Sequence, residues 1–234
     1  MRNIQSENYR NIVFFTGAGM SAESGIPTYR GRGGIWNQYR WEEYACQEAF
    51  DCDPEKVLRF HELRRQSVLE CTPHAGHFSI AGLEKKHPGL QVVTQNIDGM
   101  HQRAGNKNVS ELHGSLWRVR CPIHGILEDM NEKYKSFRCS ECGNWLRPDI
   151  IWFGDMLNQD VIHEATLIIR KCDLFISVGT SGAVWPAAGF PRIAKEQGAR
   201  CIEINPEPNE MSHIYDENIR EAAGNALSEL FPYE

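Results

Sequence analysis

Short apolar runs rich in β-branched and aromatic residues alternate with longer stretches of helical character along the chain. The runs cover residues 11–16, 90–94, 174–178 and 201–204, and each stops at glycine or polar residues. They are typical of strands buried on both faces. Segments 54–70 and 161–172 have helical character and lie between runs. The pattern predicts an α/β fold with a Rossmann-like, doubly wound parallel sheet.

Polar clusters follow three of the predicted strands. They are Gln95-Asn96-Ile97-Asp98, Gly179-Thr180-Ser181 and Asn205-Pro206-Glu207. In open parallel sheets, ligands bind beyond the carboxyl ends of the strands. These clusters therefore predict a binding site at one edge of the sheet.

A glycine-rich turn follows the first predicted strand. Gly17-Ala18-Gly19-Met20-Ser21-Ala22 fits the G-x-G-x-x-A form of the dinucleotide fingerprint, whose glycines allow a close backbone approach to pyrophosphate. A plain turn between strand and helix explains the motif equally well. No clear ribose-binding acid stands about 20 residues further on.

The polar region 120–145 interrupts the alternation of predicted strands and helices. It contains two pairs of potential metal ligands, each pair separated by two residues, which we call the knuckles. Cys121-x-x-His124 and Cys139-x-x-Cys142 are each followed by glycine. Four such ligands suit one tetrahedral structural Zn²⁺ and leave no open position for catalysis. The alternative is a lost metal site with leftover cysteines. We expect an inserted zinc-binding module at 118–145, within a dinucleotide-binding domain formed by 1–117 and 146–234.

Composition and charge narrow the classes of partner. The 234 residues carry a net charge of -6. A nucleic-acid-binding protein would be expected to have an excess of basic residues instead. No segment approaches the roughly 20 apolar residues of a membrane span, and the N-terminus has no secretory-signal pattern. We therefore expect a cytoplasmic protein whose eight cysteines are thiols or metal ligands. The oligomeric state stays open, with a monomer possible.

Six segments together resemble the sirtuin family, in the family's order and over nearly the whole chain. They are GAGMSAESGIPTYRG at 17–31, TQNIDGMHQRAG at 94–105, ELHGS at 111–115, WFGD at 152–155, VGTS at 178–181 and INPE at 204–207. The resemblance implies an NAD-dependent protein-lysine deacylase acting on acylated lysines of proteins. In the family's reaction the acyl-lysine carbonyl oxygen attacks C1′ of the nicotinamide ribose, nicotinamide leaves, and O-acyl-ADP-ribose forms.

The same resemblance implies roles for individual residues. His113 matches the general base that takes a proton from a ribose hydroxyl, and an imidazole with an ordinary pKa near 6.5 suits that task. A hydrogen-bonded core histidine is the alternative. Asn96 and Asp98 match residues that hold the nicotinamide carboxamide, although capping of a turn would also explain them. The implied NAD-binding residues are Gly17, Ala18, Gly19, Met20, Ala22, Glu23, Tyr29, Arg30, Trp36, Gln95, Asn96, Ile97, Asp98, Gly179, Thr180, Ser181, Asn205, Pro206, Glu207 and Ala223.

The chain departs from the family pattern in the metal knuckles and in the cofactor loop. The family usually supplies four cysteines, so His124 implies a Cys₃His zinc site. Tyr29 and Thr28 replace the commoner phenylalanine and aspartate. These changes keep a ligand for zinc, an aromatic face and a polar loop residue.

The helix predicted at residues 54–70 carries side chains that could contact the acyl group of the substrate. Asp53-Pro54 is a good helix start, and Val57, His61, Arg64 and Val68 then share one stripe. An amphipathic helix with a snorkelling arginine would explain this stripe. His61 and Arg64 align, however, with the Tyr-x-x-Arg pair that desuccinylase-class sirtuins use for acidic acyl chains. The implied substrate-binding residues are Ala45, His61, Arg64, Trp152, Phe153 and Gly154.

We therefore expect removal of succinyl or malonyl groups as well as acetyl. His61 in place of tyrosine leaves the preference open. A protonated His61 would strengthen anion binding, whereas a neutral ring could still donate one hydrogen bond.

Three other functions compete with deacylation. Mono-ADP-ribosyl transfer would use the same cofactor pocket, and its product would be an ADP-ribosylated protein. A non-catalytic NAD or ADP-ribose sensor would have no need of a placed base. A zinc-knuckle nucleic-acid binder would need a basic surface around the metal, but Glu128, Asp129, Glu132 and Glu141 offset the nearby lysines and arginines.

Overall fold

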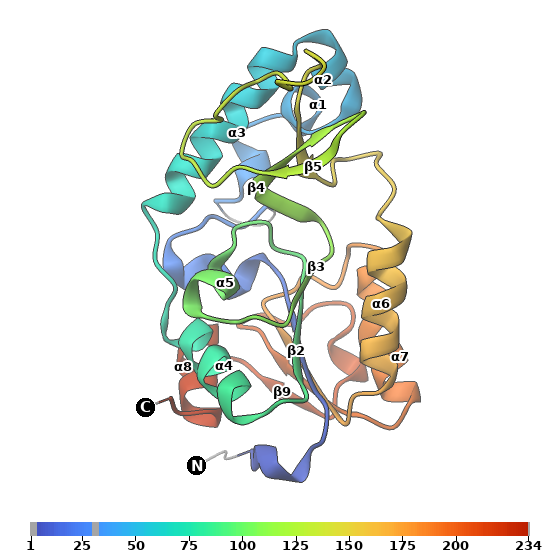
Figure 1. The fold of residues 1–234 in the computed structure, drawn as a ribbon. Helices are drawn as coiled ribbons and strands as arrows, with labels where there is room; N and C mark the ends of the chain where they lie inside the picture. The colour runs from blue at the N-terminus through green and yellow to red at the C-terminus, as the bar shows by residue number, and fades with distance from the viewer. Residues whose placement is uncertain (1–3, 30–32, 234) are drawn as a thin grey trace.

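A six-stranded parallel sheet lies in the larger part of the molecule (Figure 1). The computed structural model describes residues 4–29 and 33–233. The strand order is β3-β2-β1-β7-β8-β9, and neighbouring strands pair in parallel. The strands are β1 (Ile12–Thr16), β2 (Leu90–Thr94), β3 (Val109–Glu111), β7 (Leu174–Val178), β8 (Arg200–Ile204) and β9 (Glu217–Ile219). The four predicted strands are confirmed. The short edge strands β3 and β9 were not predicted.

Helices cover both faces of this sheet, as the apolar runs predicted. In β1, Ile12 and Phe14 pack into one core cluster, and Val13 and Phe15 pack into another. Side chains that alternate between two apolar layers explain why four successive residues of the strand, 12–15, are apolar. Helices α4 (Ala75–Lys86) and α8 (Ala223–Leu230) contribute to the first cluster, and α6 (Gln159–Arg170) and α7 (Phe190–Glu196) contribute to the second. The Rossmann-like fold is confirmed.

The strand order reverses between β1 and β7. From β1 the chain builds outward through β2 and β3, and from β7 it builds outward in the opposite direction through β8 and β9. Loops that leave β1 and β7 therefore diverge and open a crevice beyond their carboxyl ends. The glycine turn at Gly17 lies at this point.

A second, smaller layer lies above the parallel sheet in Figure 1. Its antiparallel sheet has the order β5-β4-β6, formed by β4 (Gly114–Cys121), β5 (Gly125–Glu128) and β6 (Arg147–Ile150). Helices α1 (Trp41–Tyr44), α2 (Gln47–Cys52) and α3 (Pro54–Leu69) share a core cluster with this sheet. We call these helices and strands the small lobe. They extend well beyond the 118–145 module expected from the knuckles, and the division into domains stays a prediction.

Arg65 joins α3 to the small sheet and was not predicted to have a role. Its side chain is fully buried. Its Nε donates to the carbonyl of Leu116 at 2.7 Å, and Nη1 donates to Asp129 Oδ1 at 3.1 Å. The guanidinium lies 3.8 Å from the centroid of the Tyr134 ring. A buried charge with this many partners holds the two segments in one arrangement, because separating them would leave the charge unpaired.

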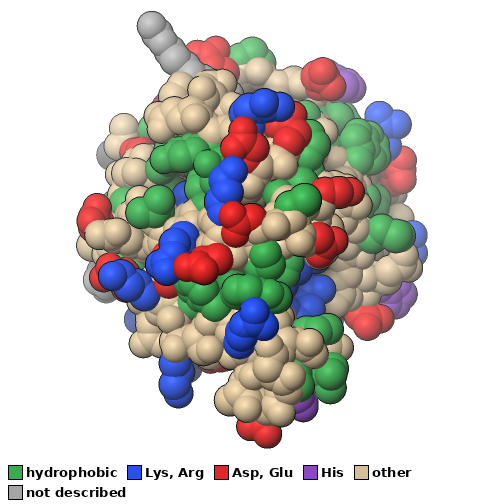
Figure 2. Space-filling view, turned by 90° about the horizontal axis from the view of Figure 1, so that it is seen from above, with side chains coloured by type: hydrophobic (Ala, Val, Ile, Leu, Met, Phe, Trp, Pro, Cys, Tyr) green, Lys and Arg blue, Asp and Glu red, His purple; other side chains and the backbone are tan. Residues whose placement is uncertain are grey.

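The remaining helices are short. They are α5 (Met100–Ala104) and the 3₁₀ helices η1 (Ser6–Asn8), η2 (Ala18–Ser24), η3 (Ile35–Asn37), η4 (Ala187–Gly189) and η5 (Ser212–Ile214). Within the described ranges, no helix combines the length and apolar character that crossing a membrane requires. On the face seen from above, acidic and basic side chains are interspersed and form no large patch of one sign (Figure 2).

Candidate active site

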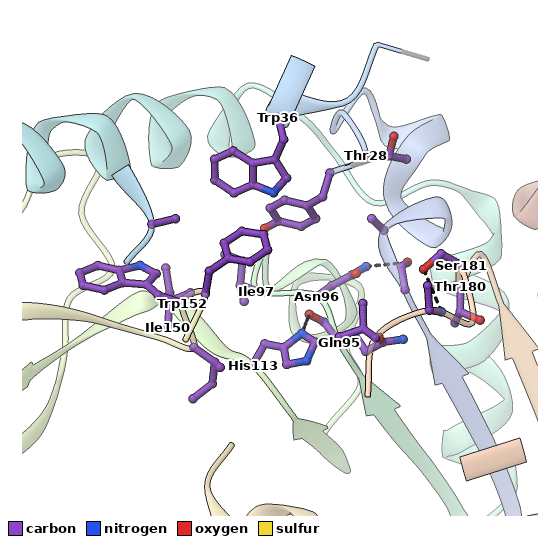
Figure 3. A pocket seen from close by; sticks show the side chains of 18 of the residues that line it. Thr28, Trp36, Gln95, Asn96, Ile97, His113, Ile150, Trp152, Thr180 and Ser181 are labelled. Carbon is purple, nitrogen blue, oxygen red and sulfur yellow. Dashed lines mark hydrogen bonds between the residues drawn. The ribbon is translucent and has the colours of Figure 1, made fainter. Parts of the chain in front are cut away.

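A cavity of about 590 Å³ opens beyond the carboxyl ends of β1, β2 and β7, below the small lobe. It brings together side chains that are far apart in the sequence (Figure 3). Among the predicted NAD-binding residues and the predicted base, those lining it are Gly17, Ala18, Gly19, Tyr29, Trp36, Gln95, Asn96, Ile97, His113, Gly179, Thr180, Ser181 and Asn205. All six predicted substrate-binding residues line it as well: Ala45, His61, Arg64, Trp152, Phe153 and Gly154.

Other predicted residues lie outside the lining. Met20 is fully buried in the core, and Glu23 accepts a hydrogen bond from the backbone N–H of Gly224 at 2.6 Å, near the start of α8. Arg30 falls outside the described residues. The others that do not line the cavity are Ala22, Asp98, Pro206, Glu207 and Ala223.

The floor of the cavity is glycine backbone. Gly19 N–H donates to the carbonyl of Gly179 at 2.9 Å, which joins the loops after β1 and β7. A Cβ on Gly19 would lie 2.7 Å from Gly179 Cα, and a Cβ on Gly179 would lie 2.3 Å from Met20 N. Side chains at these positions would separate the loops. This surface without side chains, at the point where the strand order reverses, fits the pyrophosphate of a dinucleotide.

Asn96 ties the end of β2 to the glycine turn. Its Nδ2 donates to the carbonyl of Gly17 at 3.0 Å and to Ser21 Oγ at 3.2 Å. Asp98 lies behind it, buried, and accepts from Met100 N at 2.9 Å. Burial raises the pKa of the Asp98 carboxyl, which hydrogen bonds from Met100 and Ser21 partly offset. Asn96 therefore orders the glycine turn and lines the cavity, whereas Asp98 is buried behind the lining.

His113 lies at the side of the cavity with one ring nitrogen committed to the backbone. Its Nδ1 is 3.0 Å from the carbonyl oxygen of Gln95 (Figure 3), so Nδ1–H donates there and Nε2 keeps its lone pair. The carbonyl of His113 accepts from Ile151 N at 3.0 Å, which fixes the residue at the start of β4. Burial lowers the pKa of His113, so the ring is neutral near pH 7. A neutral, oriented imidazole with a free Nε2 can accept a proton.

His61 is buried, and both of its ring nitrogens have partners. Nδ1 is 2.8 Å from the carbonyl oxygen of Val57, and Nε2 accepts from Trp152 Nε1 at 3.4 Å. Burial lowers the pKa of His61 to about 4. Of the two forms of His61 that the sequence left open, burial favours the neutral one. The ring is held neutral, with its one N–H committed to Val57.

Arg64 is the cation that faces this part of the cavity. Its guanidinium carbon lies 5.3 Å from the centroid of the Tyr29 ring. Within the described parts of the chain, no carboxylate forms an ion pair with it. Ala45 borders the same region, and its carbonyl accepts from Phe153 N at 3.0 Å. The wall thus combines a small residue with an arginine fork able to bind a carboxylate.

The four knuckle residues converge as a metal site. Cys121 Sγ is 3.5 Å from Cys142 Sγ, and His124 Nδ1 is 3.6 Å from Cys121 Sγ and 3.3 Å from Cys139 Sγ. A tetrahedral Zn²⁺ requires about 3.8 Å between sulfurs and about 3.5 Å between sulfur and nitrogen. All four ligand atoms lie within 4.8 Å of one another. The set fits one structural zinc ion, with His124 presenting Nδ1.

Several lining residues were missed by the sequence analysis. Phe60 precedes His61 and is one helical turn from Arg64, so the helix spacing could have identified it. Trp185, 70% exposed, stands in the segment after β7 and could have been noticed as an aromatic near a strand end. Leu116 and Ile150 lie on β4 and β6, whose pairing no local pattern indicates.

Fold and site together define a dinucleotide-binding α/β protein with a structural zinc site. The Sir2 family model matches residues 17–186, and the chain belongs to the Sir2, or sirtuin, family.

Similar proteins agree with this assignment over most of the chain. The NAD-dependent protein deacylase of Aquifex aeolicus is 43% identical, with 95% of each chain covered. NAD-dependent protein deacylase 2 of Pyrobaculum aerophilum is 48% identical, with 94% of this chain and 90% of the relative covered. A solved Sir2 homologue–NAD complex has a TM-score of 0.88 at 41% identity, covering 98% of this chain and 93% of that one.

Proposed function

We propose that this protein is an NAD-dependent protein-lysine deacylase in which His113 is the general base. The supporting observation is the oriented, neutral imidazole beside a glycine-floored cavity at the point where the strand order reverses. NAD supplies the ribose that accepts the acyl group, with release of nicotinamide. The test is mass analysis of the products formed from NAD and acetyl-lysine peptides. O-acyl-ADP-ribose supports the proposal, whereas ADP-ribose attached to protein would support the transferase alternative.

His113 would act through Nε2. The carbonyl of Gln95 holds Nδ1–H, so the proton of a ribose hydroxyl placed in the cavity can pass to Nε2 without a change of tautomer. The hydrogen bond from Ile151 N to the carbonyl of His113 holds the backbone at that point. A protein that only binds NAD would not need an imidazole held with Nε2 free to accept a proton. The relatives at 43% and 48% identity are also named as NAD-dependent protein deacylases.

We also propose that the acyl pocket accepts acidic acyl groups through Arg64. The support is a guanidinium that lines the cavity and has no ion pair with a described residue, beside the small Ala45. Burying that charge next to a succinyl carboxylate would pair it, which a neutral acetyl group cannot do.

Arg64→Ala is expected to lower kcat/KM for a succinyl-lysine peptide by roughly 10- to 100-fold, because a hydrogen bond to a charged group contributes about 1.5–3 kcal/mol. Turnover of the matching acetyl peptide should change less than about threefold. Steady-state rates on the two peptides measure this. Arg59→Ala is the control, because Arg59 is exposed on the same helix and pairs with Glu55. Unchanged succinyl turnover in Arg64→Ala would end this part of the proposal.

The preference between acyl groups should not depend on His61 titration. With a pKa of about 4, His61 gains a proton only well below neutral pH. The ratio of succinyl to acetyl turnover is therefore expected to stay constant between about pH 6 and pH 8, a range in which an imidazole of ordinary pKa near 6.5 would titrate. A ratio that rises as the pH falls through 6.5 would show that His61 becomes charged in the working enzyme.

We propose a cytoplasmic location for this activity. None of the eight cysteines forms a disulfide, and three of them converge with His124 in the metal cluster. Such a set of thiols suits a reducing compartment.

A further inference from the structure

His113 stands just beyond a strand that has few bonds of its own. The strand β3 has three residues, lies at the edge of the parallel sheet and pairs with β2. All three residues are half-buried. The chain then passes from β3 into β4 and the small lobe (Figure 1). Side chains around β3 therefore matter for the position of the imidazole, because the strand itself contributes little packing.

The pairing of β4 with β6 is irregular directly after the predicted base. Gly114 pairs with Ile150, and the next pair is Val119 with Pro148. Residues 115–118 of β4 therefore face residue 149 of β6 alone. An irregularity of this size interrupts the ladder of backbone hydrogen bonds and bends the strand. Other contacts have to hold the two strands together at this point.

Arg118, at the end of the irregular stretch, joins β3 to β6. Its Nη1 donates to Glu111 Oε2 at 2.7 Å, and its Nε donates to Asp149 Oδ2 at 2.9 Å. The two carboxylate side chains are only 10% and 5% exposed. The other oxygen of Glu111 accepts from Gln102 Nε2 of α5 at 3.0 Å. One guanidinium thus connects the strand that precedes the predicted base with the strand that faces it.

The backbone of the predicted base is held at the same place. Its carbonyl accepts from Ile151 N at 3.0 Å, and a Cβ on Gly114 would lie 2.0 Å from the carbonyl oxygen of Asp149. The two backbones are therefore in direct contact. A shift of β3 relative to β6 would change this contact, and with it the 3.0 Å hydrogen bond from the ring to the carbonyl of Gln95.

Two cations and two carboxylates balance one another in this cluster. Arg120 Nη2 donates to Asp149 Oδ1 at 2.7 Å, so Asp149 has two arginine partners. Burial raises the pKa of the Glu111 carboxyl, and the positive charge of Arg118 opposes that rise. Without Arg118, Asp149 would keep one cation, whereas Glu111 would keep none among the described residues. A buried carboxylate without its cation is unfavourable, so Glu111 would turn towards water and displace β3.

We propose that Arg118 is a positioning residue for deacylation: by bridging Glu111 and Asp149 it holds β3 against β6, and so keeps the His113 ring bonded to Gln95 with Nε2 available. The inference rests on the proposed deacylase function. Arg118 does not line the cavity, so it acts through His113 and not on NAD or the peptide. Supporting contacts of this kind hold reacting groups to within about 0.5 Å of the working geometry.

Arg118→Met removes the guanidinium and keeps an unbranched side chain. We expect kcat for O-acyl-ADP-ribose formation to fall by about 10- to 100-fold, because a displacement of about 1 Å is enough for such a loss. KM for NAD and for an acetyl-lysine peptide should change less than about threefold. Arg118→Lys should lose only about threefold in kcat, because an ammonium can bond one carboxylate but cannot fork between two. Steady-state rates measure these effects.

Arg120→Met is the matched control. Arg120 lies on the same strand, its side chain is 42% exposed, and its hydrogen bonds to described residues all end at Asp149. Its loss removes a cation from the cluster but leaves the bridge to β3. An exposed ion pair contributes little, so kcat should stay within about twofold of the wild-type value.

Glu111→Leu tests the bridge itself. If Arg118 acts through Glu111, the chain that carries both Arg118→Met and Glu111→Leu should have a kcat no lower than that of the more damaging single variant. Two independent effects would multiply instead. The double variant also removes both charges of the bridge. Together with Arg118→Lys, it therefore carries the test if Arg118→Met alone does not fold.

The ring of His113 offers a readout that does not depend on turnover. In the wild-type protein the proton on Nδ1, identified by its loss in His113→Ala, should give a proton NMR signal, because its hydrogen bond to Gln95 protects it from exchange with water. Arg118→Met should shift or remove this signal. Arg120→Met should leave it in place.

The possible failures are distinct. A wild-type protein that forms no O-acyl-ADP-ribose would overturn the proposed function. If the product forms, the inference about Arg118 is wrong when Arg118→Met keeps its kcat, when Arg120→Met loses as much, or when only KM changes. Multiplying effects in the double variant, or an unchanged Nδ1 signal in Arg118→Met, would contradict it as well.

Discussion

His113→Ala is expected to reduce formation of O-acyl-ADP-ribose by about 10²- to 10⁴-fold, the usual contribution of a positioned general base. In the structure no other imidazole among the described residues lines the cavity except His61, whose ring nitrogens are committed to Val57 and Trp152. Quantifying O-acyl-ADP-ribose by mass spectrometry, with NAD and peptide saturating, measures the loss.

The dependence of kcat/KM on pH should reflect the ionisation of His113. Because burial lowers the pKa of His113, the acid limb of kcat/KM is expected below the ordinary histidine value near 6.5. Activity that depends on the neutral base falls as the pH drops through the lowered pKa. His213→Ala, which changes an exposed histidine in η5, is the control and should keep both rate and profile. Full product formation by His113→Ala with intact zinc would contradict the assignment.

Cys139→Ala is expected to release the zinc and destabilise the small lobe. Structural zinc sites contribute up to about 10–16 kcal/mol in isolated peptides, so even a fraction of this is several kcal/mol. For a chain of this size 1 kcal/mol shifts Tm by about 2–4 °C, and we expect a fall of roughly 10 °C or more. Activity should fall as well, because β4 runs from Gly114, next to the predicted base, to the ligand Cys121. Metal analysis and calorimetry measure these effects.

Two further variants separate metal loss from loss of a thiol. Cys52→Ala removes an exposed cysteine outside the cluster and should leave zinc content and Tm unchanged. His124→Cys should retain one zinc per chain, since thiolate is also a ligand of structural zinc. A Cys139→Ala protein with one bound zinc and an unchanged Tm would show that the four residues do not form the site proposed.

The sequence by itself determined the central strands and the elements of the site. Runs in which successive residues are apolar indicate strands buried between two layers, so residues 12–15 and 174–176 identified the core of a doubly wound sheet. Glycines 17 and 19 predicted a tight turn after the first strand, and the structure shows that this turn packs against Gly179. The two knuckles carried the metal ligands in their own spacing, because each pair is separated by two residues. Features of this kind depend on residues that are close together in the sequence, so the sequence alone can predict them.

The extent of the small lobe, the role of Arg65 and the state of His61 were decided by the tertiary structure. Arg65 adjoins Arg64 in sequence, yet one side chain is buried against Asp129 and the other lines the cavity. His61 is neutral because Trp152 and the surrounding lobe bury it. The cavity along α6 forms only where α6 and Trp185 come together. Such features depend on contacts between segments distant along the chain, and a residue's charge, exposure and partners follow from those contacts.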